Sequence, residues 1–314
     1  MCQSKKLSKK EFDLIIKQNL IDCGIPVESF GFKIGQRIYE EYYSEDEFEK
    51  FVDEMRNNYF NHYKKFNGDK NVKENTGGKG GELAKKSSRY GLIPPKMASV
   101  ASSSRFCYIA LRDGTEVLLP DRVLTTNDVE FEKECKIFDN SSTSPQLDAY
   151  ISDDICDIYV EVKCHEIFDS HKPMFKAKYW PLFKENPSFC AVANKRDIDE
   201  ECFQLPLNIF DITKESTRFD IKQFICHLFG IAKQNNGKKS KLVYLFFKPT
   251  SNDAQTSKQI DEVFYELISE IKLIFGCKII SDFCKNNNIE LMAIAQQSQI
   301  MDKLTDNNTI YFWK

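Results

Sequence analysis

The chain has 314 residues, of which 41% are hydrophobic and 29% charged, and it contains only 13 Gly and 10 Pro, as is typical of a globular protein with a sizeable core. A net charge of −3 argues against a uniformly basic nucleic-acid binder. Because the sequence has neither a signal peptide nor an apolar run of about 18 residues, we expect a soluble, cytoplasmic protein without a membrane segment. Its 11 cysteines form no CxxC pair, which predicts reduced, mostly buried thiols and no disulfide framework.

The first 66 residues predict a helical region. FDLIIKQNLI (12–21) has helical spacing, and YSEDEFEKFVDEMRNNYFNHY (43–63) follows with Ser44 as a cap before an acidic first turn. Residues 67–81 are rich in Gly and Lys and predict a polar linker. We therefore place a domain boundary there and assign residues 82–314 to the main domain.

Basic residues gather around this boundary. Residues 64–105 contain ten Lys or Arg and only three acidic residues, although the whole chain is acidic. A local basic surface is typical of phosphate contact, while a solvated lysine-rich loop is the alternative. The candidate DNA-binding residues in this segment are Lys85, Lys86, Arg89 and Arg105.

The main domain predicts alternating helices and strands. Pro94-Pro95 begins a helix that runs to Asp113-Gly114, and VEFEKECKI (129–137) alternates as a strand does, with its three glutamates on one face. A hairpin follows, and then a helix, a strand, a helix and a strand at 217–233, 241–247, 259–275 and 289–295. The order α-β-β-β-α-β-α-β predicts an α/β fold with a mixed sheet flanked by helices.

The hairpin carries an unusual set of charges. Its strands are QLDAYI (146–151) and DIYVEVKC (157–164), so Glu161 and Lys163 share one face and Asp148 lies opposite Glu161. Unpaired carboxylates on a half-buried sheet are costly, and a cation would stabilise them. Hard oxygen ligands favour Mg²⁺, whereas a surface hairpin with a simple Glu–Lys pair is the alternative.

These residues resemble a known signature. Asp148, a gap of 12 residues, and then Glu161-Val162-Lys163 resemble the PD-(D/E)XK motif of restriction-endonuclease-like nucleases, although the literal "PD" is absent. PPKMASVASSSRFCYIAL (94–111) and the hairpin are similar to a subgroup classed as restriction endonucleases, and the resemblance covers residues 80–300. It implies a restriction-endonuclease-like αβββαβ core.

The resemblance also implies a chemistry. Asp148, Glu161 and the backbone carbonyl of Val162 would bind Mg²⁺, with Mn²⁺ as a substitute, and Lys163 would orient the attacking water and stabilise the transition state. The substrate would be double-stranded DNA. Because restriction chemistry cuts both strands, a homodimer is expected.

Several further residues are candidates for the site. Glu132, or Glu134 beside it, would complete the metal shell from the preceding strand, and Glu82 would add a helical carboxylate. His165 follows Lys163 closely, and Gln223 lies one turn before His227 on the helix at 217–233. Lysines among aromatic residues would follow a DNA backbone, or else form a solvated loop: Lys172, Lys176 and Lys178.

The sequence therefore predicts a Mg²⁺-dependent DNA endonuclease of restriction type. One alternative is a repair or recombination nuclease that recognises DNA structure or ends. Another is a non-catalytic DNA-binding protein that retains the fold. Recognition sequence and cut position have no linear signature in this chain.

Overall fold

The computed structural model describes residues 6–22, six short strand segments between residues 27 and 93, residue 99, most of residues 101–297 and residues 309–311. Between 101 and 297, the described part has gaps at 112–115, 119–121, 127–128, 139–143 and 191–200. Of the helix expected at 43–63 only Tyr43 is described, in a short strand, and the rest of it lies outside the described residues, as does the linker expected at 67–81.

A five-stranded mixed sheet forms the centre of the molecule. Its spatial order is β15-β14-β11-β10-β9. Within this sheet, β9, β10 and β11 form an antiparallel meander. The strands β14 and β15 then run parallel to β11. The predicted hairpin and mixed sheet are thus confirmed. The strands are β9 (Glu130–Glu134), β10 (Gln146–Ser152), β11 (Cys156–Lys163), β14 (Lys239–Lys248) and β15 (Ile289–Gln297).

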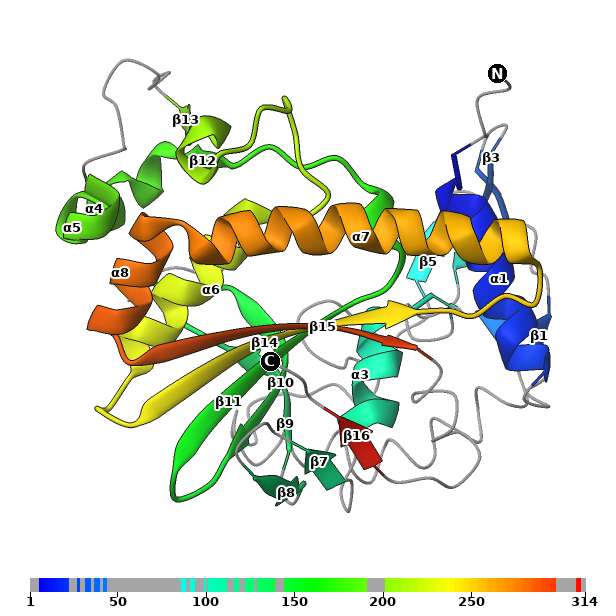
Figure 1. Ribbon diagram of the computed structural model, residues 1–314, viewed down its shortest axis with the longest axis horizontal. Coiled ribbons are helices and arrows are strands. Elements are labelled where there is room, and N and C mark those ends of the chain that lie inside the picture. The colour runs from blue at the N-terminus through cyan, green and yellow to red at the C-terminus, as the bar shows by residue number, and fades with distance from the viewer. Residues whose placement is uncertain are drawn as a thin grey trace.

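Helices cover both faces of this sheet (Figure 1). Strand side chains alternate between faces, so two residues of β14 three positions apart report on opposite sides. Tyr244 contacts His227 of α6 (Ile221–Gln234), and Phe247 stacks on Phe106 of α3 (Ser103–Leu111) at 4.3 Å. The long helix α7 (Ala254–Gly276) lies on the side of α6, where Phe275 stacks on Phe224 at 5.1 Å. The helix α8 (Lys278–Asn286) follows α7 and contacts β15.

The N-terminal helix α1 (Lys9–Asp22) packs on this body. Phe12 lies 4.9 Å from the ring of Phe168 and 6.4 Å from that of Phe264 in α7. Asn19 exchanges hydrogen bonds with the main chain of Thr250, at 2.8 and 2.9 Å. The helix predicted at 12–21 is confirmed. The short strands that follow it were not predicted: β1 (Val27–Glu28), β2 (Phe32–Ile34), β3 (Arg37–Tyr39) and β4 (Tyr42–Tyr43).

An insertion separates β11 from α6. Aromatic rings fix it to the helices, with Phe183 at 5.2 Å from Phe229 and Phe189 at 5.3 Å from Phe283. Its described elements are η2 (His165–Phe168), β12 (Met174–Lys176), η3 (Ala177–Tyr179), α4 (Trp180–Glu185), α5 (Pro187–Cys190), β13 (Cys202–Gln204) and η5 (Leu207–Phe210).

The remaining short strands lie apart from the central sheet. Three of them form a sheet of order β16-β7-β8: β7 (Glu116–Leu118), β8 (Val123–Thr125) and β16 (Thr309–Tyr311). The other two form a hairpin: β5 (Lys86–Ser88) and β6 (Gly91–Ile93).

Two predicted helix starts are wrong, and the reason is local capping. The helix expected from Pro94 begins only at Ser103, because Ser102 caps it by accepting a hydrogen bond from the Arg105 N–H at 3.2 Å. The helix expected from residue 217 begins at Ile221, capped by Asp220, while Thr217 instead pairs in an extended bridge with His171. The short helix α8 was not predicted.

Two expectations from composition can be compared with the described residues. The nine cysteines among them are all free thiols, and Cys107, Cys135 and Cys226 are buried as predicted. In the same part of the chain, no helix combines the length and apolar character needed to cross a lipid bilayer.

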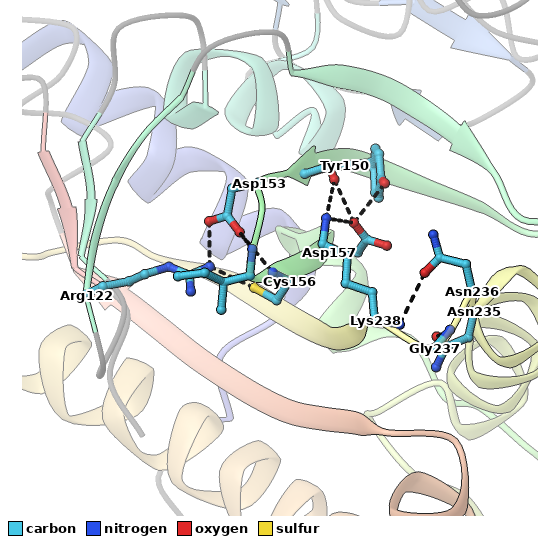
Figure 2. A network of polar contacts seen from close by, with 11 residues as sticks. Arg122, Tyr150, Asp153, Cys156, Asp157, Asn235, Asn236, Gly237 and Lys238 are labelled. Carbon is cyan, nitrogen blue, oxygen red and sulfur yellow. Dashed lines mark hydrogen bonds and ion pairs between the residues drawn. The ribbon is translucent and has the colours of Figure 1, made fainter.

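A polar network closes the tip of the β10–β11 hairpin (Figure 2). Asp153 accepts hydrogen bonds from the N–H groups of Ile155 and Cys156 and forms an ion pair with Arg122 at 2.6 Å. Nearby, Asp157 accepts hydrogen bonds from three groups, at 3.1, 2.7 and 3.0 Å: Tyr150, Ser152 and Lys238. Asp153 and Asp157 thus each have a cation and hydrogen-bond donors at this end of the hairpin.

Candidate active site

At the opposite end of the hairpin, two carboxylates occupy neighbouring strands. The β10–β11 register pairs Ala149 with Val160, which places Asp148 opposite Glu161 on the same face of the sheet. The regular ladder stops there, and the Val162 N–H donates to Asp148 Oδ2 at 2.6 Å. The two carboxylates therefore lie where the strands separate.

Glu161 is buried among hydrogen-bond donors. Its Oε1 accepts from Lys163 Nζ at 2.7 Å and from Gln223 Nε2 at 2.9 Å. After the insertion the chain returns to β11 as helix α6, which brings Gln223 to the site despite its distance from Glu161 in the sequence. The structure places Asp148, Glu161, Lys163 and Gln223 together.

The charges of this group are strongly coupled. Burial raises the pKa of Asp148 well above its ordinary value, and Glu161 and Glu132 raise it further, whereas Lys163 and the Val162 N–H oppose the shift. Burial alone would lower the pKa of Lys163, but Glu161, Glu166 and Asp148 together raise it. Lys163 is therefore a firmly protonated cation beside an excess of negative charge.

Glu132 lies next to this group in a strained conformation. The β9–β10 register pairs Lys133 with Leu147 and Phe131 with Ala149, so Glu132 falls opposite Asp148. Its φ of 55° is left-handed. That conformation costs a non-glycine residue roughly 1–3 kcal/mol and is concentrated at functional sites. By contrast, Glu134 lies two residues farther along, opposite Gln146.

His227 adds a neutral imidazole beneath Glu161. It is fully buried, and burial lowers its pKa. Nε2 lies 3.2 Å from the Gln146 carbonyl, which can only accept, so Nε2 carries the proton and Nδ1 accepts from the Tyr244 hydroxyl at 3.0 Å. The same Nε2 is 3.8 Å from Glu161 Oε2. Tyr244 was not recognised from the sequence, where it is one of many aromatic residues in an apolar strand.

The donor chemistry of the site suits a hard cation. Asp148 and Glu161 supply carboxylate oxygens, and the Val162 carbonyl belongs to the residue whose N–H meets Asp148. Binding of a cation would also relieve the repulsion that raises the Asp148 pKa. However, the described residues contain no group of three or more His, Cys, Asp or Glu side chains arranged to hold a metal ion. Any metal would depend on two carboxylates and main-chain oxygen.

Other predicted site residues lie elsewhere. His165 does not continue the strand face of Glu161 and Lys163: β11 ends at Lys163, the chain turns into η2, and the His165 Nδ1 is 2.8 Å from Asp13 of α1. Arg105 is 4% exposed within α3, so its expected contact with DNA phosphate is wrong. Glu82, Lys85 and Arg89 lie outside the described residues, and Lys86 is described only as part of β5.

The three candidate lysines of the insertion are all exposed to solvent: Lys172, Lys176 and Lys178. The Lys178 Nζ also lies 5.5 Å from the rings of Phe138 and Tyr179. All three therefore stay candidates for contact with a backbone phosphate.

Comparison with known proteins adds no relative: no family model, no curated protein and no solved structure matches this chain. The geometry around Glu161 is therefore the basis for assigning a function.

Proposed function

We propose that this chain is a Mg²⁺-dependent endonuclease that hydrolyses phosphodiester bonds in double-stranded DNA, with a restriction-endonuclease-like core. The observation that supports it best is the juxtaposition of Asp148, Glu161 and Lys163 where β10 and β11 separate. A structural ion pair would need one carboxylate for one lysine. Here three carboxylates, those of Asp148, Glu161 and Glu132, lie close enough to repel one another around a single lysine.

The residues have distinct roles in this proposal. Asp148, Glu161 and the Val162 carbonyl would hold Mg²⁺, whose contribution when bound is to lower the pKa of a water ligand and neutralise phosphate charge. Because its pKa is raised, Lys163 acts as a donor and a positive charge toward the phosphate, not as a base. Gln223 holds Glu161 Oε1 and so fixes the orientation of that carboxylate.

The restriction role and the dimer belong to the same proposal. A two-fold dimer would present one site to each strand of a duplex. Incubation with plasmid and genomic DNA separates the alternatives: discrete bands support restriction, and smears support repair or degradation. Binding without cutting would support a non-catalytic protein.

The decisive experiment measures plasmid cleavage with Mg²⁺, Mn²⁺, Ca²⁺ or EDTA. We expect cutting with Mg²⁺ and Mn²⁺, and DNA binding without cutting in Ca²⁺, which accepts looser geometry. Asp148→Asn should abolish cutting and retain the fold. The matched control is Asp282→Asn, on the exposed outer surface of α8, which should cut as the wild type does. Full activity in EDTA, or an active Asp148→Asn variant, would refute the proposal.

A further inference from the structure

A pocket of about 180 Å³ lies beside the candidate active site. It begins at Lys163 and Gln223 and extends between η2, the chain before α6 and the ends of β11 and β14. This volume is well below the roughly 300–1,000 Å³ of sites for drug-sized ligands, so it admits one small ring system. Its charged or titratable lining residues are Lys163, Glu166, Asp169, His171, Arg218 and Asp220.

Aromatic rings form one side of this pocket. Phe219 lies 4.9 Å from Tyr244 and 6.5 Å from Phe246, and the latter two rings are nearly parallel. All three are at most 2% exposed, so the surrounding core holds them rigidly and they present almost no ring face for stacking. As an apolar wall they disfavour a charged ligand and tolerate a flat, unsaturated ring.

The polar lining contains both donors and acceptors. Arg218 uses Nε for Glu266 and one Nη1 hydrogen for the Ile167 carbonyl, which leaves Nη2 without a protein partner in the described part of the chain. Among the acceptors, Glu166 Oε2 accepts a hydrogen bond from the Cys164 N–H. One guanidinium, one ammonium group and several carboxylates thus line one small space.

This mixture excludes a phosphate as the natural occupant. Three carboxylates line the pocket, namely Glu166, Asp169 and Asp220. The permanent cations in the lining are two, Lys163 and Arg218. A phosphate would meet like charges there, and like-charge juxtaposition is strongly unfavourable. A neutral ring whose edge carries both N–H donors and carbonyl acceptors matches the lining.

We infer that this pocket receives a single nucleobase, unstacked from the DNA next to the bond that is cut. The inference rests on the proposed nuclease function, because Lys163 belongs to both the pocket and the candidate active site. Extracting a paired base from a duplex costs unstacking and unpairing energy, and the cost is least for a base without a partner. Among duplex substrates, DNA with an unpaired or weakly paired nucleotide at the cleavage position should therefore be preferred.

His171 provides a way to close the pocket without touching the carboxylates of the active site. Its main chain is held by Thr217 through two hydrogen bonds of 2.9 and 3.0 Å, whatever the side chain. The side chain lines the pocket, is 24% exposed and contacts Asp220 at 3.4 Å. His171→Trp would fill the space, whereas His171→Ala loses the same contact and leaves the pocket open.

The experiment compares three duplexes in Ca²⁺: fully paired, with one unpaired nucleotide, and with an abasic sugar at the unpaired position. For the wild type and His171→Ala, we expect the unpaired nucleotide to bind about tenfold or more tightly than either other duplex, because an abasic sugar has no base to enter the pocket and a paired base must first be extracted. His171→Trp should bind all three alike. Equal affinities in the wild type, or equal behaviour of the two variants, would overturn the inference.

The outcomes separate this inference from the nuclease proposal. Cleavage in Mg²⁺ without a preference for the unpaired base would leave the nuclease and remove the base pocket. A preference for the unpaired base without cleavage in any divalent cation would support the base pocket in a DNA-binding protein and refute the nuclease.

Discussion

Both ends of the β10–β11 hairpin carry carboxylate side chains, but the two ends differ in how many cations and hydrogen-bond donors those carboxylates have. At the tip, Asp153 has Arg122 and two N–H groups, and Asp157 has Lys238 and two hydroxyl groups. At the open end, Asp148 and Glu161 share one lysine, with Glu132 adding negative charge. Fully compensated carboxylates stabilise a fold, whereas an excess of them at one place is typical of sites whose chemistry needs it. The same hairpin therefore separates a stabilising end from a reactive end.

The largest expected difference between the ends is in catalysis. Lys163→Met should reduce the cleavage rate by about a thousandfold or more, because the charge that faces the phosphate is lost. Asp157→Asn at the tip should change the rate less than about twofold when both proteins are folded. Single-turnover cleavage below the melting range of each variant measures this. Similar losses of cleavage rate in Lys163→Met and Asp157→Asn would mean that the two ends of the hairpin do not differ in catalysis.

Stability should show the reverse pattern. Asp157→Ala removes the acceptor that Lys238 and two hydroxyl groups share, which should lower the free energy of unfolding by about 2 kcal/mol. Urea unfolding followed by circular dichroism gives this value. The isosteric Asp157→Asn keeps one acceptor oxygen and should lose less. A loss below about 0.5 kcal/mol for Asp157→Ala would mean that the tip is not a stabilising network.

Removal of charge from the open end should stabilise the protein without metal. The pKa of Asp148 is raised on folding, so the folded state holds its proton more tightly than the unfolded state does. The resulting penalty develops as pH rises from about 3.8 through the raised value, and it is absent at lower pH. Asp148→Asn in EDTA should therefore melt above the wild type at neutral pH and close to it near pH 3.5. A lower melting temperature at pH 7 would contradict this.

The smallest expected effect concerns the exposed lysines. If Lys172 and Lys176 contact DNA phosphates, their replacement by Gln should flatten the salt dependence of binding by a slope of about 0.9 for each contact on duplex DNA. The affinity loss should be similar for all sequences, because phosphate contacts carry little sequence information. Lys239→Gln, near the tip of the hairpin, is the matched control and should leave the slope unchanged. Titrations in Ca²⁺ at several salt concentrations measure the slopes, and unchanged slopes would assign DNA contact to other residues.

Local patterns in the sequence predicted the hairpin well. Alternation of apolar residues and the length of the turn are sufficient to bring Asp148 opposite Glu161, because register is set within a few residues. Gln223 was a candidate, but its contact with Glu161 depends on how the insertion folds back, which no local pattern encodes.

The errors also have physical causes. His165 follows the active strand closely, yet Asp13 of a helix far away in the sequence holds it. Arg105 lies in a basic segment, yet the capped helix that carries it packs into the core. In both cases a tertiary contact decided the position of a side chain whose local sequence indicated a surface role.

The docking of α1 has a consequence for synthesis on the ribosome. Phe12 packs on Phe168 and Phe264, so the surface that receives α1 is translated long after the helix itself. At about 5–20 residues per second, roughly tens of seconds pass before α7 follows. During that time Phe12, Ile16 and Leu20, which are all fully buried in the folded protein, lack the part of their packing surface that α7 supplies. The helix α1 can meet Phe168 earlier, but its docking is complete only after α7 has emerged.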